Sequence, residues 1–284
     1  MNYSHFLKII PDKIYIQLMY LYHLHTFADL KEPKTFNEKI QWLKLHDHRP
    51  EYVIMVDKYA AKEFVAGKIG SEHIIPTIGV WKNVGEIDFE SLPNQFVLKW
   101  NHDSKSVVIC KDKSQFDSTI AKNKLRKGEK LNGFWYGREW PYKNVPPIII
   151  AEQYLQQDNS DNTDLIDYKF FCFNGIPKYI QVIQNRSTQE TIDIFDTQWQ
   201  HQDFIGLNPR ATHAKKTITR PDKLEEMIEI AKKLSKDIPF ARIDLYEVDG
   251  RVYFGEITFF PASGFGRFYP EKWNKIIGDM IKIP

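Results

Sequence analysis

The sequence predicts an α+β fold in which helices come first and an antiparallel sheet occupies the second half of the chain. Apolar residues in the first fifty positions recur at three- and four-residue spacing, which is the period of an amphipathic helix. Beyond residue 164 several alternating apolar segments follow one another, and the turn signal Asn174-Gly175 joins the first two. A second turn signal, Asp249-Gly250, joins the strands of a hairpin over residues 240–259. Because strands joined by tight turns pair antiparallel, we expect an antiparallel sheet.

The individual elements follow from local patterns. Thr35 and Glu38 form a capping box, which predicts that a helix begins at Phe36. A glycine ends a further helical pattern, and β-branched runs bounded by turn residues predict the strands. The expected helices are residues 14–22, 36–46, 52–68, a charged helix within 113–139 followed by a loop at 131–140, and 222–238. The expected strands are residues 72–81, two strands around a polar loop in 95–110, 146–157, 165–175, 176–185, 190–199 and the terminal hairpin.

Composition limits the partner and the compartment. The 284 residues are 42% hydrophobic, which is enough to bury a substantial core. The 39 basic and 37 acidic residues nearly cancel, which argues against a nucleic acid as the main partner. Cys110 and Cys172 lie far apart without metal-ligand spacing, so neither a disulfide framework nor a zinc site is expected. These features favour a protein of the reducing cytoplasm.

The first 25 residues are aromatic and apolar, but Pro11, Asp12 and Lys13 interrupt them. No segment reaches the roughly 18 to 20 apolar residues that span a bilayer. We therefore expect an amphipathic helix that packs its apolar stripe on the core. Peripheral contact with the inner face of a membrane is the open alternative.

Two carboxylates in the terminal hairpin are the most informative candidates. Asp244 lies six residues before Gly250 and Glu256 lies six after it, so a tight turn brings the two acids close to opposite one another, subject to register. Like charges at such a distance need a proton or a cation between them, and oxygen ligands suit Mg²⁺. The alternative is that each acid forms a salt bridge with a neighbour such as Arg242 or Arg251.

Three earlier features could contribute to the same site. Lys99 ends an apolar strand ahead of a small polar loop, where its ammonium and the loop amides could hold phosphates, although the glycines of a Walker loop are absent. The backbone of Glu152–Leu155 could meet an adenine edge. Lys169 interrupts an aromatic strand and could point into the same cleft. The alternatives are a snorkelling strand-end lysine, a plain core strand and a lysine on a solvent-facing strand surface.

Taken in order, these pieces resemble the ATP-grasp superfamily, and most closely its TupA-like (teichuronopeptide biosynthesis) branch, which is associated with bacterial surface polysaccharides. The resemblance covers roughly residues 36–278. The matching segments are KTFNEKIQWLKLHD, DKYAAKEFV, IIPTIGVW, FVLKWNHDS, AEQYL, DYKFFCFNG, FARIDLY and FGEITFFPASGFGRFYP. The resemblance implies two α+β subdomains that clasp ATP, with a helical N-terminal extension. The expected limits are 1–70 for the helical region, 71–150 for the small subdomain with the phosphate loop and 151–284 for the subdomain with the metal site.

The resemblance also implies roles for the candidate residues. Lys99 corresponds to the triphosphate lysine and residues 101–106 to a mobile loop over ATP. Asp244 and Glu256 correspond to Mg²⁺ ligands. The cofactor-binding candidates are Lys99, Asn101, Ser104, Lys105, Ser106, Glu152, Gln153, Tyr154, Leu155 and Lys169. One position departs from the pattern: Thr258 stands where many members carry asparagine as a third metal ligand, and its neutral hydroxyl is the weaker ligand.

The chemistry implied is activation of a carboxylate as an acyl phosphate by ATP, followed by attack of an amine to form an amide. Arg242, Lys169 and His102 are the catalytic candidates, with Arg242 stabilising the acyl phosphate and His102 as a base for the amine. The substrate-binding candidates are Arg186, Gly264, Gly266 and Arg267, because glycines allow close approach and arginine can hold a carboxylate. The expected substrates are an amino acid and a sugar carboxylate, such as a uronic acid of a capsule, O-antigen or cell-wall polymer.

Two other functions stay open at this point. A glycosyltransferase would also use a carboxylate-bound metal, and the segment between Asn159 and Asn162 offers a weak match to the short acidic cluster of such enzymes. A nucleotide-binding protein with reduced catalysis is the second alternative, and Thr258 is the feature that supports it.

Overall fold

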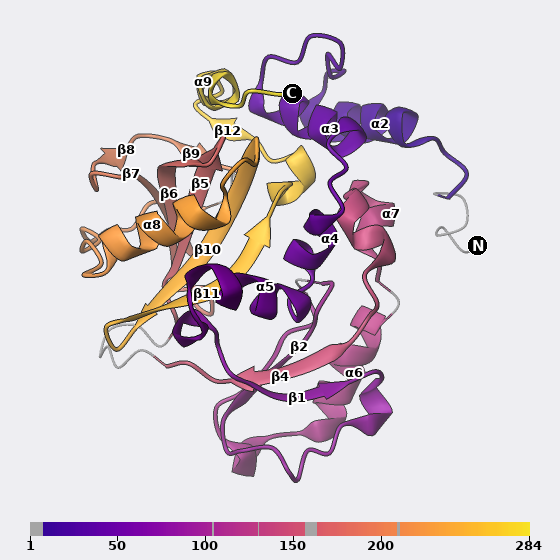
Figure 1. Cartoon of the computed structure of the whole chain (residues 1–284), viewed down its shortest axis with the longest axis vertical. Coiled ribbons are helices and arrows are strands. Elements are labelled where there is room, and N and C mark those ends of the chain that lie inside the picture. Colours follow the sequence, from indigo (N-terminus) through magenta and orange to yellow (C-terminus); the bar gives the residue numbers. More distant parts are fainter. Residues whose placement is uncertain (1–7, 104, 130, 157–163, 209–210) are drawn as a thin grey trace.

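The computed structural model describes residues 8–103, 105–129, 131–156, 164–208 and 211–284. Its mixture of helices and antiparallel sheets confirms the predicted α+β class. Figure 1 shows a four-stranded sheet with helix α6 (Ser118–Glu129) at the bottom of the view and a six-stranded sheet above it. Helices α4 (Glu51–Val56) and α5 (Ala60–Ile69) lie between the two sheets.

The six-stranded sheet has the order β11-β10-β5-β6-β7-β8. Its strands are β5 (Asp167–Phe173), β6 (Ile176–Gln184), β7 (Thr191–Asp196), β8 (His201–Gln202), β10 (Phe240–Val248) and β11 (Arg251–Thr258). Every neighbouring pair is antiparallel, which confirms the predicted antiparallel sheet, and the two turn signals join β5 to β6 and β10 to β11. A small ribbon pairs β9 (Ile205–Gly206) with β12 (Phe268–Tyr269).

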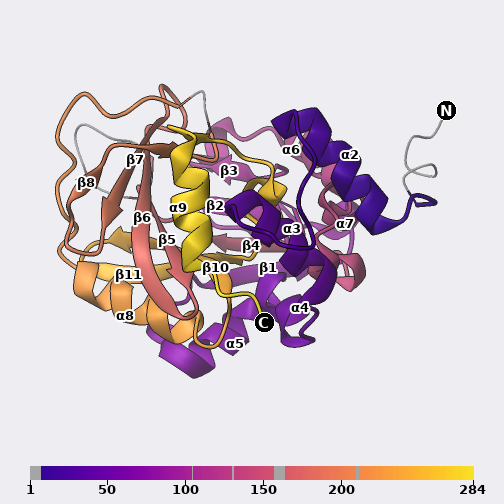
Figure 2. The same ribbon diagram turned by 90° about the horizontal axis from the view of Figure 1, so that it is seen from above.

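The central strand β5 is buried on both faces. On one face the Cys172 thiol points at α8 (Leu224–Leu234). On the other face Phe171 and Phe173 pack around Phe240, which also meets Phe36 of α3 (Phe36–His46). Figure 2 shows α9 (Lys272–Met280) beside α3 over this second face. This second face of β5 is apolar at the end near α3, and polar side chains occupy its other end.

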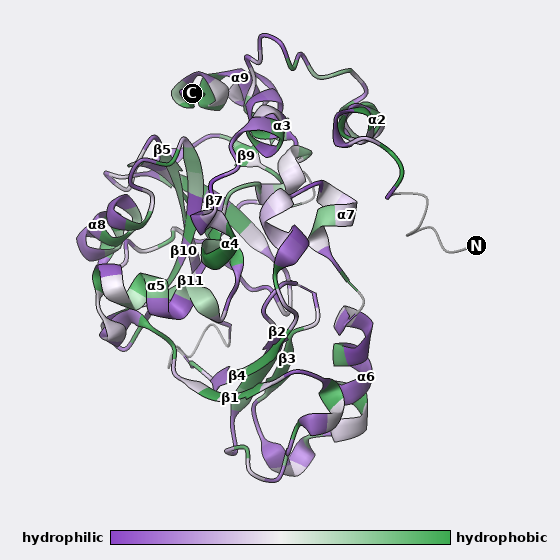
Figure 3. Cartoon of the chain, turned by 45° about the vertical axis from the view of Figure 1, so that its right-hand side comes forward, coloured by the Kyte–Doolittle hydropathy of each residue, from purple (hydrophilic) through white to green (hydrophobic). Residues whose placement is uncertain are grey.

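The four-stranded sheet has the order β1-β4-β2-β3, and its strands appear largely hydrophobic in Figure 3. The strands are β1 (Thr77–Trp81), β2 (Phe96–Trp100), β3 (Val108–Cys110) and β4 (Ile149–Gln153). One face carries Phe96, Leu98 and Trp100 into a core shared with α6, where the Trp100 indole donates to the Leu125 carbonyl at 2.8 Å. Strand β4 crosses the expected boundary at residues 150/151, and the three subdomain limits stay a prediction.

One predicted helix and one predicted loop differ in the structure. The single helix over residues 52–68 is wrong, because Asp57 interrupts it with extended backbone and accepts the amides of Tyr59 and Ala60 at 2.9 and 3.2 Å. In the predicted loop at 131–140, residues Gly133–Gly137 form the short helix α7, which begins where Asn132 accepts the amide of Phe134 at 3.0 Å. Short 3₁₀ turns follow or connect the helices at Ser71–His73 (η1), Val84–Glu86 (η2), Lys113–Gln115 (η3), Trp140–Asn144 (η4) and Pro261–Gly264 (η5).

Helix α2 (Asp12–Leu24) presents a different face to the core than the sequence predicts. The stripe expected to pack inward is exposed at Ile14, Leu18, Leu21 and Tyr22. The buried residues are instead Tyr15, Ile16 and Tyr20, because apolar side chains lie on more than one face of this helix. Among the described residues, no helix is both long and apolar enough to cross a membrane. Peripheral membrane contact stays a prediction, and the exposed stripe identifies the residues that would make it.

Candidate active site

A β-bulge in the terminal hairpin sets the geometry of the site. Pairing runs from Val248 opposite Arg251 to Leu245 opposite Phe254, and then the register shifts so that Asp244 lies opposite Glu256. Gly255 is the extra residue. A Cβ atom at Gly255 would lie 3.0 Å from the Asp244 carbonyl oxygen, which is closer than a side chain tolerates without rearrangement. The bulge therefore confirms the predicted juxtaposition of the two acids.

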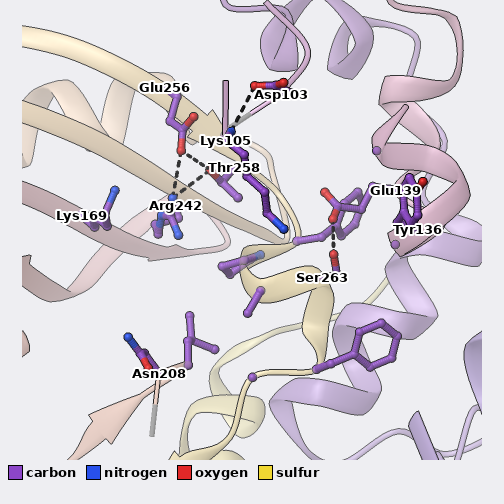
Figure 4. A pocket seen from close by; sticks show the side chains of 18 of the residues that line it. Asp103, Lys105, Tyr136, Glu139, Lys169, Asn208, Arg242, Glu256, Thr258 and Ser263 are labelled. Atoms are coloured by element: carbon purple, nitrogen blue, oxygen red, sulfur yellow. Dashed lines mark hydrogen bonds and ion pairs between the residues drawn. The ribbon is translucent and has the colours of Figure 1, made fainter. Parts of the chain in front are cut away.

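The guanidinium of Arg242 links the acidic residues of β10 and β11. Its Nε and Nη2 atoms donate to Asp244 Oδ1 and Oδ2 at 2.7 and 2.8 Å. The same Nη2 atom donates to Glu256 Oε1 and to Thr258 Oγ1, each at 3.1 Å. The salt-bridge alternative is thus realised through Arg242, and Arg242, Glu256 and Thr258 converge on one point (Figure 4).

Lys169 extends this network onto β5. It lies directly opposite Asp244 in the sheet, and its ammonium forms a buried ion pair with Asp244. Asp167 lies 3.5 Å from the same ammonium and also receives Nε of Arg186 at 2.8 Å. The lysine therefore points to the site rather than to solvent, as the sequence predicts.

Surrounding charges control protonation at the site. Burial alone would raise the pKa of Glu256, but Lys58, Arg242 and Lys169 lower it well below the ordinary range of a glutamate. Burial opposes the charge of Arg242, but Asp244 and Glu256 nevertheless raise its pKa. Glu256 is therefore a carboxylate and Arg242 a cation at neutral pH.

Two lysines that the sequence analysis did not assign take part. Lys58, between α4 and α5, places its ammonium 3.5 Å from Glu256 Oε2. Lys62 of α5 lies 2.6 Å from Glu152 Oε1. Lys99 approaches the other oxygen, Glu152 Oε2, at 2.5 Å. Burial would raise the pKa of Glu152, but Lys99 and Lys62 lower it. The carboxylate therefore stays ionised and pairs with both ammonium groups, on the face of the small sheet that is turned toward the large sheet.

Most of the predicted phosphate loop is occupied by internal contacts. The Asn101 side chain donates to the Pro146 carbonyl at 2.9 Å and accepts the Ile148 amide at 3.0 Å, which fixes β2 to the approach of β4. The amides of Lys105 and Ser106 both donate to Asp103 Oδ1 at 3.1 Å. Ser104 lies outside the described residues.

The other residue of this loop is His102. Its imidazole Nδ1 lies 3.2 Å from Asn101 Oδ1, and burial lowers its pKa. A neutral imidazole can accept a proton, so the geometry allows the predicted role as a base but leaves that role a prediction.

A cavity of about 1130 Å³ brings many of the predicted residues together. The predicted residues that line it are His102, Lys105, Lys169, Arg186, Arg242, Glu256, Thr258, Gly266 and Arg267. Lys99, Asn101, Ser106, Glu152, Leu155, Asp244 and Gly264 do not line it. The wall that faces Arg242 is built by Glu139 and Ser263, which the sequence analysis did not single out (Figure 4).

The predicted substrate residues all have internal contacts, and the Gly266 carbonyl accepts the Asn37 side-chain amide at 2.9 Å. The carbonyl oxygen of Gly264 accepts the side-chain amides of Asn37 and Gln41 at 2.8 and 3.0 Å. The Arg267 guanidinium donates to the His23 carbonyl near the end of α2, with Nη2 at 2.6 Å. Gly266 lines the cavity, and Arg186 lines it from the Asp167 side. These positions leave the role of each in substrate binding a prediction.

The predicted adenine segment does not line the large cavity. Gln153 and Tyr154 line a separate cavity of about 400 Å³ together with Pro76 and Asn94. The Gln153 amide already donates to the Pro76 carbonyl at 3.0 Å. Leu155 is buried in a small apolar cluster. Contact of this segment with adenine stays a prediction.

The donor set fits Mg²⁺ in part. Glu256 and Thr258 present oxygen atoms to the cavity, and oxygen ligands are those that Mg²⁺ prefers. Asp244 lies behind Arg242, with both carboxylate oxygens in ion pairs. Glu256 is therefore the carboxylate most accessible to an ion, and Asp244 becomes a ligand only if Arg242 moves.

A chemically different cluster lies outside the cavity lining, on β7, on β8 and in the segment after β9. His201 Nε2 and His213 Nδ1 each lie 2.9 Å from Asp193 Oδ1. Its nitrogen donors distinguish it from the oxygen-only set in the cavity. The acidic segment between Asn159 and Asn162 lies outside the described residues, so the structure adds nothing to the glycosyltransferase reading of that segment.

Comparison with known proteins identifies the sequence family. A family model described as "TupA-like ATPgrasp" matches residues 38–282. No curated protein sequence matches the chain.

Several solved ligases resemble the fold. D-alanine–D-alanine ligase from Bacillus anthracis, complexed with ATP, is 16% identical at a TM-score of 0.41, over 72% of this chain and 55% of that one. The same enzyme from Helicobacter pylori is 14% identical at a TM-score of 0.45, over 88% and 70%. ATP-grasp ligase PsnB, complexed with minimal precursor, Mg and ADP, is 7% identical at a TM-score of 0.38, over 74% and 52%. The chain thus spans little more than half of the first of these ligases, and likeness at this level says nothing about substrates.

Proposed function

The chain belongs to the TupA-like ATP-grasp family, and from this premise we propose that it is an ATP-dependent ligase that joins a carboxylate to an amine through an acyl phosphate. The single observation that supports this proposal most directly is the cavity wall where Arg242 meets Glu256 and Thr258. Lys169 and Lys105 line the same space. Cations beside oxygen ligands are what a transferring phosphoryl group needs, because its charge must be neutralised.

The nucleotide would lie between the two sheets. We place the triphosphate near Lys99, Lys169 and the loop 101–106, and the adenine against residues 152–155. Lys99 forms an ion pair with Glu152 in the structure, so a phosphate that binds Lys99 would compete with Glu152.

The metal ion would be Mg²⁺, held by Glu256 and Thr258 and also by Asp244 once Arg242 moves from its oxygens. Bound there, the ion neutralises phosphate charge. Arg242 orients and stabilises the acyl phosphate, and its own position is fixed by the bidentate pair with Asp244.

We propose an amino acid and a uronic acid of a capsule, O-antigen or cell-wall polymer as the substrates, with the reaction in the cytoplasm at the inner face of the membrane. This choice rests on the resemblance to the teichuronopeptide branch. The size of the cavity is compatible with it, because 1130 Å³ exceeds what a nucleotide phosphate and one amino acid occupy alone.

The proposal is tested by ADP release from Mg-ATP with panels of amino acids and uronic acids. Release that requires both an amine and a carboxylate supports a ligase. Glu256→Gln should abolish turnover in a chain that still folds. Glu247→Gln, the same substitution on the same hairpin but outside the cavity lining, should leave turnover unchanged. A large loss of stability in Glu256→Gln with turnover retained would favour a purely structural ion pair.

The same assay separates the alternatives. UDP release from UDP-sugars without ATP would contradict the ligase and support a glycosyltransferase. ATP binding without turnover for any pair of the panel would support a nucleotide-binding protein, which Thr258 in place of asparagine favours.

A further inference from the structure

Glu139 is an acidic side chain in the cavity to which the roles proposed above give no task. It lies between α7 and η4, and its Oε1 atom accepts a hydrogen bond from the Ser263 hydroxyl. Among the described residues, no cation lies within 4 Å of this carboxylate, and Oε2 has no hydrogen-bond donor. Figure 4 shows Glu139 and Ser263 on the wall that faces Arg242 and Thr258. The carboxylate is therefore directed at the space where a substrate would lie.

The nearest lysine does not neutralise Glu139 by direct contact. The buried ammonium of Lys44 donates to the carbonyls of Gly137 and Ser263, each at 2.6 Å. It also lies 4.7 Å from the centre of the Phe265 ring. Lys44 thus holds the two backbone segments that carry Glu139 and Ser263, and leaves the carboxylate free for a ligand.

The turn that presents Ser263 is strained. Ala262 and Ser263 both adopt left-handed backbone, with φ of 49° and 51°. Such a conformation is unfavourable for a non-glycine residue, so surrounding contacts must hold it. Lys44 and Gln41 do so by donating to the Ser263 carbonyl at 2.6 and 3.1 Å. The strain is stored where it fixes the hydroxyl that orients Glu139.

The other acids of the cavity already have partners. Glu256 is paired with Lys58 and Arg242. Asp103 Oδ1 accepts two loop amides. Glu190 accepts the side-chain amide of Asn208 at 3.0 Å. Among the described residues, Asp103 Oδ2 is also buried without a hydrogen-bond partner. Glu139 differs from Asp103 because it lies on the wall that faces Arg242 and Thr258, with Oε2 left for a positively charged group.

A carboxylate at this position can both bind an amine substrate and remove its proton. At neutral pH an α-amino group is largely protonated, so it binds best beside an anion. It must also lose a proton before its nitrogen can attack. Burial raises the pKa of Glu139, which makes its carboxylate a stronger base than an exposed glutamate. The charge of Lys44 and the hydrogen bond from Ser263 lower this pKa in part without cancelling the effect of burial. The charges of Glu256 and Arg242 also act on Glu139, which places it within electrostatic reach of the reacting centre.

We propose that Glu139 binds the ammonium group of the amine substrate and accepts its proton as the nitrogen attacks, while Ser263 orients the carboxylate; this inference rests on the proposed ligase function. The proton passes from nitrogen to Glu139, and the freed electron pair forms the C–N bond. The C–O bond to phosphate breaks, and phosphate leaves with the electron pair of that C–O bond. The nitrogen gives its remaining extra proton to the departing phosphate. Glu139 thus takes the role of base that the sequence analysis gave to His102.

Binding of amines tests the inference without turnover. We would measure the affinity of L-alanine, L-serine and L-glutamate, and of their N-acetyl derivatives, by titration calorimetry with Mg²⁺ and a non-hydrolysable ATP analogue. The native chain should bind at least one free amine roughly 10-fold or more tightly than its N-acetyl derivative, because hydrogen bonds to charged groups are the strong ones. Glu139→Gln should remove this preference, and Glu190→Gln, a matched glutamate of the same cavity, should keep it. The inference is wrong if the native chain shows no preference or if Glu139→Gln retains it.

Trapping separates this inference from the ligase proposal. Hydroxylamine is uncharged at neutral pH and reacts with acyl phosphates, so hydroxamate formation from glucuronate and Mg-ATP reports the first half of the reaction alone. Glu139→Gln should form hydroxamate at the native rate and lose the reaction with amino acids. Loss of hydroxamate in Glu139→Gln would contradict the inference, whereas a native chain that forms no hydroxamate from any uronate contradicts the ligase proposal. If Glu139→Gln unfolds, Ser263→Ala tests the same point, with an expected several-fold rise in KM for the amine at unchanged hydroxamate formation.

Discussion

Glu152 joins two lysines across different elements, and Glu152→Gln removes the charge that holds them. The carboxylate is 4% exposed and lies 2.5 Å from the ammonium of Lys99 and 2.6 Å from that of Lys62. Glutamine keeps the shape and one hydrogen-bond acceptor but leaves two like charges side by side without a counter-ion. We expect the substitution to destabilise the chain strongly.

The size of the effect follows from these distances. At an effective dielectric constant of about 20, each pair contributes roughly 6 to 7 kcal/mol of attraction, most of which is offset by the loss of hydration. Removing one partner of a buried pair costs about 3 to 5 kcal/mol, and the lower value applies because the lysine side chains keep 13% and 15% exposure. For 284 residues the unfolding entropy is about 0.6 kcal/mol per kelvin, so 3 kcal/mol lowers Tm by about 5 °C.

Calorimetry of both proteins at several pH values measures this effect. The pKa of Glu152 is lowered in the folded chain, so its stabilisation is complete above about pH 4.5, the ordinary value, and is lost as the pH falls through the folded value. The Tm difference between native and Glu152→Gln should therefore be full at pH 7 and shrink in acid. The control is Glu225→Gln, which removes an exposed pair with Arg220 and should change Tm by less than about 1 °C. A Glu152→Gln protein as stable as the native one at pH 7 would refute the argument.

Three further predictions follow from single contacts. Gly255→Ala places a Cβ atom 2.9 Å from the Tyr246 ring and 3.0 Å from the Asp244 carbonyl, so we expect a loss of about 1 to 3 kcal/mol in urea unfolding together with reduced turnover; full turnover would show that the bulge is dispensable. Asp57→Ala removes the acceptor of two amides at the start of α5 and should cost about 1 kcal/mol, seen as a Tm lower by about 2 °C. Lys99→Ala should weaken ATP binding in titration calorimetry, and unchanged affinity would contradict its proposed contact with the triphosphate.

The sheet could be predicted because its turns are local. Asn174 and Gly175 have φ of 50° and 80°, and Asp249 and Gly250 have φ of 51° and 70°. Two successive positive φ angles are the requirement of a tight hairpin turn, and these residue pairs adopt them readily. Strand pairing on each side then follows from the alternation of the segments. In contrast, the break at Asp57 depends on one side chain within an otherwise helical pattern, and the pattern hides it.

The residues of the site that the sequence did not predict lie in segments with no distinctive local pattern. Lys58 and Lys62 are polar positions of a helical segment, and such lysines are most often in solvent. Their direction toward Glu256 and Glu152 depends on the placement of α4 and α5 between the two sheets, which no local pattern encodes. Glu139 is likewise one acid in an aromatic stretch of the sequence. Only the fold places the strained turn at Ser263 beside it. Tertiary packing, rather than periodicity, supplies this part of the chemistry.

The most consequential detail lies within the hairpin itself. A regular ladder from the Asp249-Gly250 turn would pair Asp244 with Gly255, and Glu256 would then point to the opposite face of the sheet from Asp244. The observed shift at Gly255 moves Glu256 and Thr258 onto the face that carries Arg242, so that one guanidinium reaches all three oxygen-bearing side chains. A glycine inside a strand is the sequence signal for such a bulge, because the extra residue lets the backbone of the partner strand approach closely. Asp244 and Glu256 therefore share one face of the sheet only because Gly255, the residue before Glu256, forms the bulge.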